Sequence, residues 1–394
     1  MVVVKTHVGL EAVCRIRGEW EKLQYHPNSD LDHCLLVCRL RSEVLHPWAL
    51  SVWDGDHCRA IVAGRLEQSR LRPRLGYASL PGVPARVLVI LHEGILGELD
   101  KEDSQAVVEA HFQALHRGQA DVISLHALPE TFPALWDAVR ARPRQTLGAI
   151  SPIWTVHRGL TLPKEPGFLL KNMRSKHRSW VKRKERELSE AFSNGIQWFW
   201  HKDIADLPHL CRRMEAVART TYQRGVGAGF IDNEEWRQRL TLFAKRGQTR
   251  VLLLEIDGAP KAFWLGTIYA NVFYSGATGY VPDMRPFEVG TSIFLRLTDE
   301  LVREGVERLD FGLGDAEYKQ RFADRSRREA DLQLFGESSK SRLLQAYLGG
   351  TDILNRVARR TVQHLGVFAR VKQAWRTRLR NRQATQSLGT TNRS

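Results

Sequence analysis

The chain has 394 residues, of which 43% are hydrophobic and 26% charged, and its formal net charge is +15. This length predicts two domains of roughly 150 residues, each with enough apolar residues for a core. No apolar run approaches the ~18 residues that span a bilayer, and the opening MVVVKTHVGL lacks the pattern of a secretory signal. The five cysteines form no CxxC pair, which favours reduced core thiols in a cytoplasmic protein.

The positive charge is concentrated in two segments. Residues 171–187 hold eight Lys or Arg against two Glu, and residues 340–394 hold twelve against one Asp. These segments carry more than the whole net charge, so the rest of the chain is close to neutral. Basicity therefore belongs to two segments rather than to the fold, and it suits anionic partners.

The first half of the chain predicts a mixed α/β unit. Strands are expected at residues 48–53, 58–67 and 86–91, and in the segment DVISL. Asp54-Gly55 separates the first two strands, which is the pattern of a hairpin. A helix is expected to end near Gly118. LTLPKEPGF, residues 160–168, is a plausible linker to the second half.

The second half predicts the same order with sharper patterns. After a basic helix at 171–192, strands are expected at 196–200, 251–256, 261–270, 272–280, 307–311 and 330–335, and helices at 207–223 and 291–304. Asp257-Gly258 and a second tight turn near Asn271 predict a three-stranded antiparallel meander. Gly55 and Gly258 occupy corresponding turns, as Gly118 and Gly305 occupy corresponding helix ends. The pattern indicates two copies of one mixed α/β unit.

The stretch DFGLGDAEYKQRF, residues 310–322, gathers titratable side chains where a strand ends. Amide formation needs a base for the attacking ammonium and an acid for the leaving group, and a carboxylate and a phenol can fill these roles. On a helix, Asp315 would share a face with Tyr318 and with Lys319. The alternative is an ordinary polar helix start, whose acidic residues favour the N-terminus, with Asp310 holding the turn.

The meander–helix–strand–helix order resembles the acyl-CoA N-acyltransferase (GNAT) superfamily. DFGLGDAEYKQRF is similar to the Asp…Gly-Asp-x-x-Tyr-Lys signature of the CelD/BioF-like acetyltransferase family of bacterial polysaccharide gene clusters. The Fem-type aminoacyltransferases, distant relatives with tandem GNAT units, have a comparable aromatic–lysine pair. The resemblance covers roughly residues 169–335, and the first half more weakly. It implies an α/β (α+β mixed) fold of two tandem GNAT-like units with a basic C-terminal helical tail.

The domain boundaries expected from this resemblance are a degenerate unit at 1–160, a catalytic unit at 161–340 and the tail at 341–394. Acyl-CoA, such as acetyl-CoA, is the implied co-substrate. Backbone N–H groups at the start of a helix suit a pyrophosphate. The candidate donor-binding residues are Val289, Gly290, Thr291 and Ser292. Gly290 would let the phosphate approach, and Thr291 or Ser292 would add a hydroxyl, although the superfamily's fuller glycine loop is only partly present. The alternative is a capped helix start.

The resemblance also assigns roles in catalysis. Tyr318 would be the general acid, Asp315 or Glu317 the base or the holder of the acceptor amine, and Lys319 the group that binds an acceptor carboxylate, phosphate or carbonyl. No metal is expected, because the histidines show no metal-binding spacing. Nucleic acid is not the expected partner, since the basic helix lacks a reading motif or interleaved aromatic residues.

The expected function is that of a bacterial N-acyltransferase that moves an acyl group from acyl-CoA to an amine. The acceptor would be a small molecule or a glycan- or lipid-linked amine, such as an amino sugar or amino-acid moiety in surface polysaccharide or lipid biosynthesis. Two alternatives remain open. One is Fem-type transfer of an aminoacyl group from charged tRNA, and the other is a non-catalytic binding protein of a polysaccharide-synthesis complex.

The C-terminal tail has an apolar stripe at helical spacing from Leu354 to Leu379, with arginines off the stripe. Such a basic amphipathic helix can lie on an anionic membrane, which would place the protein peripherally at the inner face of the membrane. The alternative is that the stripe packs on the protein's own core.

Overall fold

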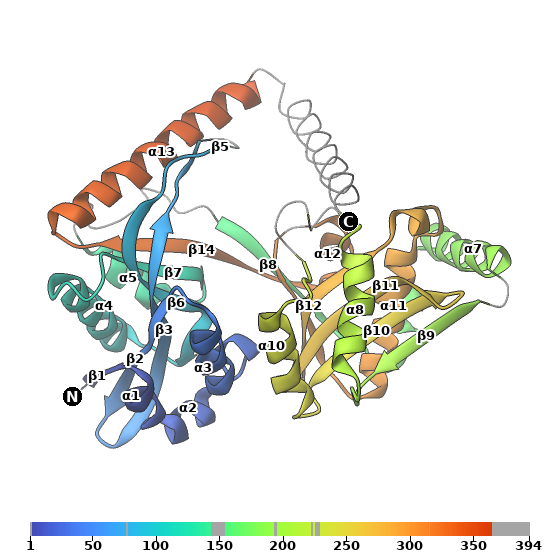
Figure 1. Cartoon of the computed structure of the whole chain (residues 1–394), viewed down its shortest axis with the longest axis horizontal. Helices are drawn as coiled ribbons and strands as arrows, with labels where there is room; N and C mark the ends of the chain where they lie inside the picture. The colour runs from blue at the N-terminus through green and yellow to red at the C-terminus, as the bar shows by residue number, and fades with distance from the viewer. Residues whose placement is uncertain are drawn as a thin grey trace, which may run out of the picture. The chain divides into compact units, whose positions relative to one another are not determined.

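The computed structural model describes residues 2–75, 78–142, 154–192, 195–221, 224, 229–314 and 316–364 (Figure 1). These residues form two units. Unit 1 comprises Met1–His157, Leu313–Asp315 and Ser326–Gly366, and unit 2 contains Arg158–Gly312 and Ala316–Arg325. Across the described ranges, no helix combines the length and apolar character needed to cross a membrane.

Unit 1 is built on a mixed sheet. Its strands, in spatial order, are β1 (Val2–Val8), β2 (Val44–Asp54), β3 (His57–Leu71), β6 (Val83–Gly97), β7 (Val122–Pro129) and β14 (Arg325–Phe335). The pairs from β1 to β6 are antiparallel, β6 and β7 are parallel, and β14 is antiparallel to β7. The start of β8 (Trp154–Thr161) also belongs to this unit, where Thr155 Oγ1 donates to the carbonyl of Glu329 at 3.2 Å.

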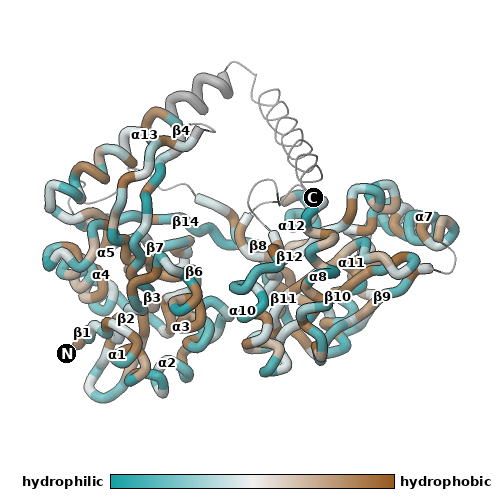
Figure 2. Tube along the Cα trace, viewed as in Figure 1, coloured by the Kyte–Doolittle hydropathy of each residue, from teal (hydrophilic) through white to brown (hydrophobic). Residues whose placement is uncertain are grey.

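Helices cover the two faces of this sheet because successive strand residues point to opposite sides. Trp48, Leu50 and Val52 pack with α4 (Lys101–His116) and α5 (Pro133–Arg140). Ala49, between them, packs on the other side. The helices between β1 and β2 are α1 (Leu10–Cys14), α2 (Arg17–Leu23), η1 (Pro27–Ser29) and α3 (Leu31–Leu40). Figure 2 shows the hydrophobic character of the central strands, for example along β3.

Unit 2 repeats the same strand pattern. Its strands in spatial order are β9 (Ile196–His201), β10 (Thr249–Ile256), β11 (Ala259–Tyr269), β12 (Val272–Tyr280) and β13 (Arg308–Leu313). The first four are antiparallel, and β12 is parallel to β13. Both predicted turns are confirmed, since Asp257 and Gly258 have φ of 51° and 73°, and Ala270 and Asn271 have φ of 45° and 61°, as type I′ hairpins require.

One face of the unit 2 sheet packs on α11 (Val289–Arg303), and the other packs on α8 (Leu207–Ala218) and α10 (Glu234–Ala244). The remaining helices are α6 (Phe168–Asn172), α7 (Ser175–Ala191), η3 (Pro282–Phe287) and α12 (Glu317–Phe322). The predicted basic helix is thus divided into α6 and α7. Within α7 the buried residues are Val181 and Leu188, which leaves most of its charged side chains at the surface.

The shared strand order confirms a mixed α/β chain that is built from two similar units in tandem. The boundaries at 160 and 340 stay a prediction, because in space β14 belongs with the first unit rather than with the residues that precede it.

The last described helix is α13 (Ser339–His364) in unit 1. Leu344 is buried there with Ala85, Val87 and Val122, whereas Leu354 is exposed. The described part of the helix therefore packs on the core near its start and not at Leu354. Residues 365–394, most of the predicted stripe, lie outside the described residues.

The small strands β4 (Arg74–Leu75) and β5 (Ala78–Ser79) form a two-stranded hairpin beside α13, and the Tyr347 hydroxyl donates to the carbonyl of Pro81 at 3.0 Å.

Candidate active site

The predicted donor-binding residues lie in the first turn of α11. The N–H groups of Thr291 and Ser292 donate to the carbonyl of Glu288, at 2.9 and 3.3 Å. Glu288 is the N-cap residue, with a left-handed φ of 52°, and its side chain does not cap the helix. The N–H groups of Val289 and Gly290 therefore stand at the helix end, where the macrodipole favours an anion.

Burial separates the roles of these four residues. Val289 and Ser292 are 0% and 2% exposed, and Thr291 is 8% exposed. Of the four, only Gly290 is half-buried. A hydroxyl contact from Thr291 or Ser292 to a bound phosphate would need these side chains to move, so the geometry favours backbone contacts near Gly290.

Gly290 also lies against Tyr280, the last residue of β12. A Cβ added at Gly290 would lie 3.1 Å from Cε1 of the Tyr280 ring. A contact this short is tighter than most, so the ring would have to shift by a few tenths of an ångström to admit a side chain at Gly290. The ring is 37% exposed and can contact a ligand there.

Tyr318, the predicted general acid, is half-buried on α12 within a group of aromatic rings. Its ring meets Trp264 of β11 and Phe311 of β13 edge-on, with centroids 5.9 Å away in each case. Phe294 of α11 packs on both Trp264 and Phe311. Because Phe294 is one helical turn beyond Gly290, these contacts tie Tyr318 to the helix that carries the predicted donor site.

Lys319 is buried, and its ammonium group is occupied by the backbone. Nζ donates to the carbonyl of Phe311 at 2.7 Å and to that of Gly312 at 3.3 Å. The contact fixes α12 against the end of β13. These two contacts are compatible with a positioning role for Lys319, whose neighbour on the helix is Tyr318, and its predicted contact with an acceptor stays a prediction.

The carboxylates of residues 310–322 differ in their surroundings. Glu317 is largely exposed and lies 3.6 Å from Arg321 in an ion pair. Asp310 Oδ1 accepts from the N–H of Gly312 at 2.6 Å, which holds the turn as expected. Asp315, the remaining candidate for the base, lies outside the described residues, and so does the predicted Asp315–Tyr318 pair.

The parallel strands β12 and β13 part at this site. Val272 to Tyr274 pair with Arg308 to Asp310, after which β12 continues beside β11 across a register shift. The two carbonyls bound by Lys319 follow directly after the paired part of β13. Ligands of open α/β sheets commonly bind beyond the carboxyl ends of strands that diverge, which is where α11 and α12 begin.

The fold also brings together a cluster that the sequence did not reveal. His92, Glu93, His157 and Glu329 of unit 1 have ligand-type atoms that all lie within 4.8 Å of one another. Burial would raise the pKa of Glu329, but hydrogen bonds with His157, His92 and Arg327 outweigh it and hold that pKa far below its usual range. Burial of Glu93 is likewise outweighed, chiefly by Arg327, and its pKa is lowered.

Part of unit 2 matches a known protein family. Residues 175–320 match the family described as acetyltransferase (GNAT) domain. The sequence has no significant match among curated proteins. Among solved structures, FemX is similar with a TM-score of 0.56 and 10% identity, covering 81% of this chain and 96% of FemX. This likeness shows a shared fold.

Two further structures align at lower scores. L-PGS from Bacillus licheniformis has a TM-score of 0.48 and 11% identity, covering 87% of this chain and 96% of that one. A tandem GNAT protein from the clavulanic acid biosynthesis pathway has a TM-score of 0.45 and 12% identity, covering 86% and 100%. The matched family domain includes α11, β13 and the start of α12 with Tyr318. This chain thus carries a GNAT acetyltransferase domain in its second unit, and it is an acyltransferase.

Proposed function

We propose that the protein transfers an acyl group from acyl-CoA to an amine, and that unit 2 carries out the transfer. The observation that carries this proposal is the connection of Tyr318, through Trp264 and Phe294, to α11, whose first turn contains Gly290. A donor held at the start of α11 and an acid held on α12 are the two parts that the reaction needs. The family match over residues 175–320 supports the same assignment.

In the proposed reaction, the amine nitrogen bonds to the acyl carbon as the bond from that carbon to the CoA sulfur breaks. The phenol of Tyr318 gives its proton to the departing thiolate, and a carboxylate takes the proton that the amine loses. Glu317 is largely exposed and paired with Arg321, which leaves Asp315 as the better candidate for the base. Lys319 holds α12 in place through its two carbonyl contacts.

For the acceptor, we propose an amino sugar or amino-acid moiety of a surface polysaccharide or lipid. Support comes from the signature in residues 310–322 and from the exposed basic side chains of α7, such as Lys176, Lys182 and Arg183. These cations would attract an acceptor linked to a nucleotide or a lipid phosphate. We further propose that the basic tail holds the protein peripherally at an anionic membrane.

Replacement of Tyr318 by Phe tests the central assignment. It removes one hydroxyl and keeps the ring contacts, so folding and CoA binding should persist while turnover falls by roughly 10²-fold. Turnover is followed as thiol release from acetyl-CoA in the presence of a panel of amino sugars and amino acids. Tyr347→Phe removes a hydroxyl from α13 in unit 1 and is the matched control. Equal turnover in Tyr318→Phe and the wild type would mean that residues 310–322 form only an ordinary helix start.

A second candidate is Fem-type transfer of an aminoacyl group from tRNA. It is supported by the similarity in fold to FemX and by the basic α7. The two functions differ in their donor. RNA that co-purifies with the protein and is lost when Lys182 and Arg183 are replaced by Glu would favour the tRNA-dependent reaction, and CoA binding without RNA would favour the first proposal.

A further inference from the structure

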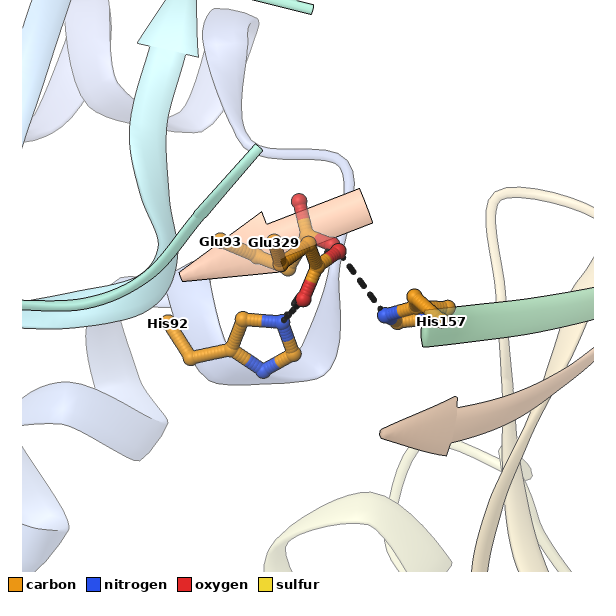
Figure 3. A group of neighbouring side chains, drawn as sticks. All are labelled: His92, Glu93, His157 and Glu329. Carbon is orange, nitrogen blue, oxygen red and sulfur yellow. Dashed lines mark hydrogen bonds and ion pairs between the residues drawn. The ribbon is translucent and has the colours of Figure 1, made fainter. Parts of the chain in front are cut away.

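The histidine–glutamate cluster in unit 1 draws its side chains from three strands (Figure 3). His92 and Glu93 come from β6, His157 from β8 and Glu329 from β14. His157 Nδ1 lies 2.9 Å from Glu329 Oε1, and His92 Nε2 lies 3.2 Å from Glu329 Oε2. His92 Nε2 is also 3.7 Å from Glu93 Oε1. Three of the four residues are buried, and His92 is half-buried.

We propose that these four residues form a binding site for one divalent transition-metal ion, with Zn²⁺ as the best fit. Zinc takes nitrogen and carboxylate oxygen ligands at about 2.0–2.1 Å, usually in a tetrahedron, so neighbouring ligand atoms should lie roughly 3.4 Å from one another. In the cluster, one ligand atom from each of the four residues lies within 4.8 Å of the others, so a small inward shift of the side chains would bring them to this spacing. Imidazole nitrogens favour zinc over calcium or magnesium.

The backbone is shaped to present two of the ligands. In the β3–β6 pair, Val62 lies opposite Ile95 and Gly64 opposite Ile90, so residues 91–94 face a single residue, Ala63. Glu93 has a left-handed φ of 58° within this bulge. A Cβ on Gly94 would lie 2.7 Å from the carbonyl oxygen of Leu91 and 2.8 Å from that of Ala63. Bulges of this kind re-aim side chains, often at functional sites.

Outer contacts hold the carboxylates in place. The Tyr25 hydroxyl donates to Glu93 Oε2 at 2.6 Å. Arg327 Nε donates to Glu329 Oε1 at 2.6 Å, and Arg327 Nη2 donates to Glu93 Oε1. Hydrogen bonds to the ligating carboxylates are a regular part of metal sites, where they orient the ligands.

A pocket lies beside the cluster. It is lined by Tyr25, Glu93, Gly94, His126, Ala127 and Phe132, among others. It lies where β6 and β7 stop pairing, after Ile90 and Leu125. Of the four cluster residues, Glu93 is the one that lines this pocket.

The cluster sets two carboxylates against one guanidinium, that of Arg327. Glu93 and Glu329 bring two negative charges, and Arg327 compensates one of them. The other can be compensated by a metal ion or by a proton on one of the imidazoles, and these two occupants make different predictions for metal binding. The expectation of no metal came from sequence spacing, which does not bear on residues that are joined only by the fold.

The test is titration of the full chain with Zn²⁺, after removal of bound metal by EDTA and of any histidine tag. Isothermal titration calorimetry should show one ion per chain. His157→Gln and Glu329→Gln should each weaken binding by at least about 100-fold, since each removes a ligand. Tyr25→Phe, which removes only an outer hydrogen bond, should weaken it by about 10-fold. His57→Gln, at an exposed position in the same unit, should have no effect.

A second measurement guards against variants that fail to fold. Co²⁺ added to the metal-free wild type should give the intense visible absorption of a tetrahedral site, and Zn²⁺ should abolish that absorption and raise the melting temperature. Failure of the folded wild type to bind Zn²⁺, or equal binding by folded His92→Gln/His157→Gln, would overturn the proposal and leave a proton as the occupant.

Discussion

His111 offers a sharp test of how burial in unit 1 controls stability. The residue lies on α4, 2% exposed, with its ring tilted against Trp48 at a centroid distance of 5.4 Å. Nδ1 is 2.7 Å from the carbonyl of Val107, and Nε2 has no hydrogen-bond partner among the described residues. Burial disfavours the charged form and lowers the pKa of His111 from 6.5 to about 4.

The sign and size of the effect follow from linkage. Because the pKa is lower in the folded state, the unfolded chain binds more protons between pH 6.5 and 4, and stability is lost as the pH falls through that window. With these two pKa values, His111 alone lowers the free energy of unfolding by about 2 kcal/mol between pH 7 and pH 5. Replacement by Leu removes the titrating group and keeps an apolar side chain of similar size.

The assay is urea denaturation of the wild type and of His111→Leu at several pH values from 7 to 5. The difference in unfolding free energy between the two proteins should shift by about 2 kcal/mol across this range, with the wild type losing more. His116→Leu, at an exposed position on the same helix, should follow the wild type. If the difference in unfolding free energy between the wild type and His111→Leu stays constant with pH, burial does not keep this imidazole neutral.

Three further predictions concern unit 2 and the tail. Gly290→Asp should abolish CoA binding in calorimetric titrations, because it adds a negative charge at the helix start and a side chain against Tyr280. Gly290→Ala adds the bulk without the charge and is the control. Unchanged CoA affinity in the folded Asp variant would exclude this turn from the donor site. Lys319→Met should destabilise the protein by about 2–3 kcal/mol in urea denaturation, since two carbonyls of β13 lose a charged donor, and a wild-type midpoint would contradict the positioning role. Deletion of residues 365–394 should abolish flotation with anionic vesicles at low salt while leaving the melting temperature unchanged, and flotation of the truncated chain would exclude the tail as the membrane contact.

The meander of unit 2 was predictable because local signals agree there. The predicted strand at 272–280 has the observed bounds, and the helix predicted at 291–304 is observed at Val289–Arg303. Left-handed turns at Asp257-Gly258 and near Asn271 fix the register between strongly apolar runs. Sequence and fold coincide where turn chemistry and hydrophobic pattern give the same answer.

Other parts of unit 1 depend on contacts that no local pattern records. β3 extends to Leu71 and β6 begins at Val83, beyond the apolar cores predicted for both strands, because polar residues such as Gln68 and Arg86 pair with each other. The edge strand β1 is interrupted by polar residues and was not predicted. Propensity is a weak guide for such strands, since their pairing partner supplies the stability.

In the candidate site, too, some features follow from the local sequence and others depend on contacts between distant residues. Tyr318 could be singled out because its neighbours in the sequence form a recognisable signature. The role of Lys319 could not, because it depends on two carbonyls that β13 presents only after the sheet has formed. Glu329 lies more than 200 residues from Glu93 in the sequence, so only the pairing of distant strands brings the two together.

The return of β14 to the first sheet has a consequence for biosynthesis. Residues 1–157 leave the ribosome early, but the strand that covers the β7 edge comes from residues 325–335, after nearly all of unit 2 has been made. Until then β7 presents unpaired backbone groups and buried-type side chains such as Ile123 and Leu125, which is a hazard for edge-to-edge association. A chain truncated before residue 325 would lack β14, so β7 would remain an unpaired edge strand and the first unit would be prone to aggregate. The first sheet can therefore be completed only after residue 335 has been synthesised.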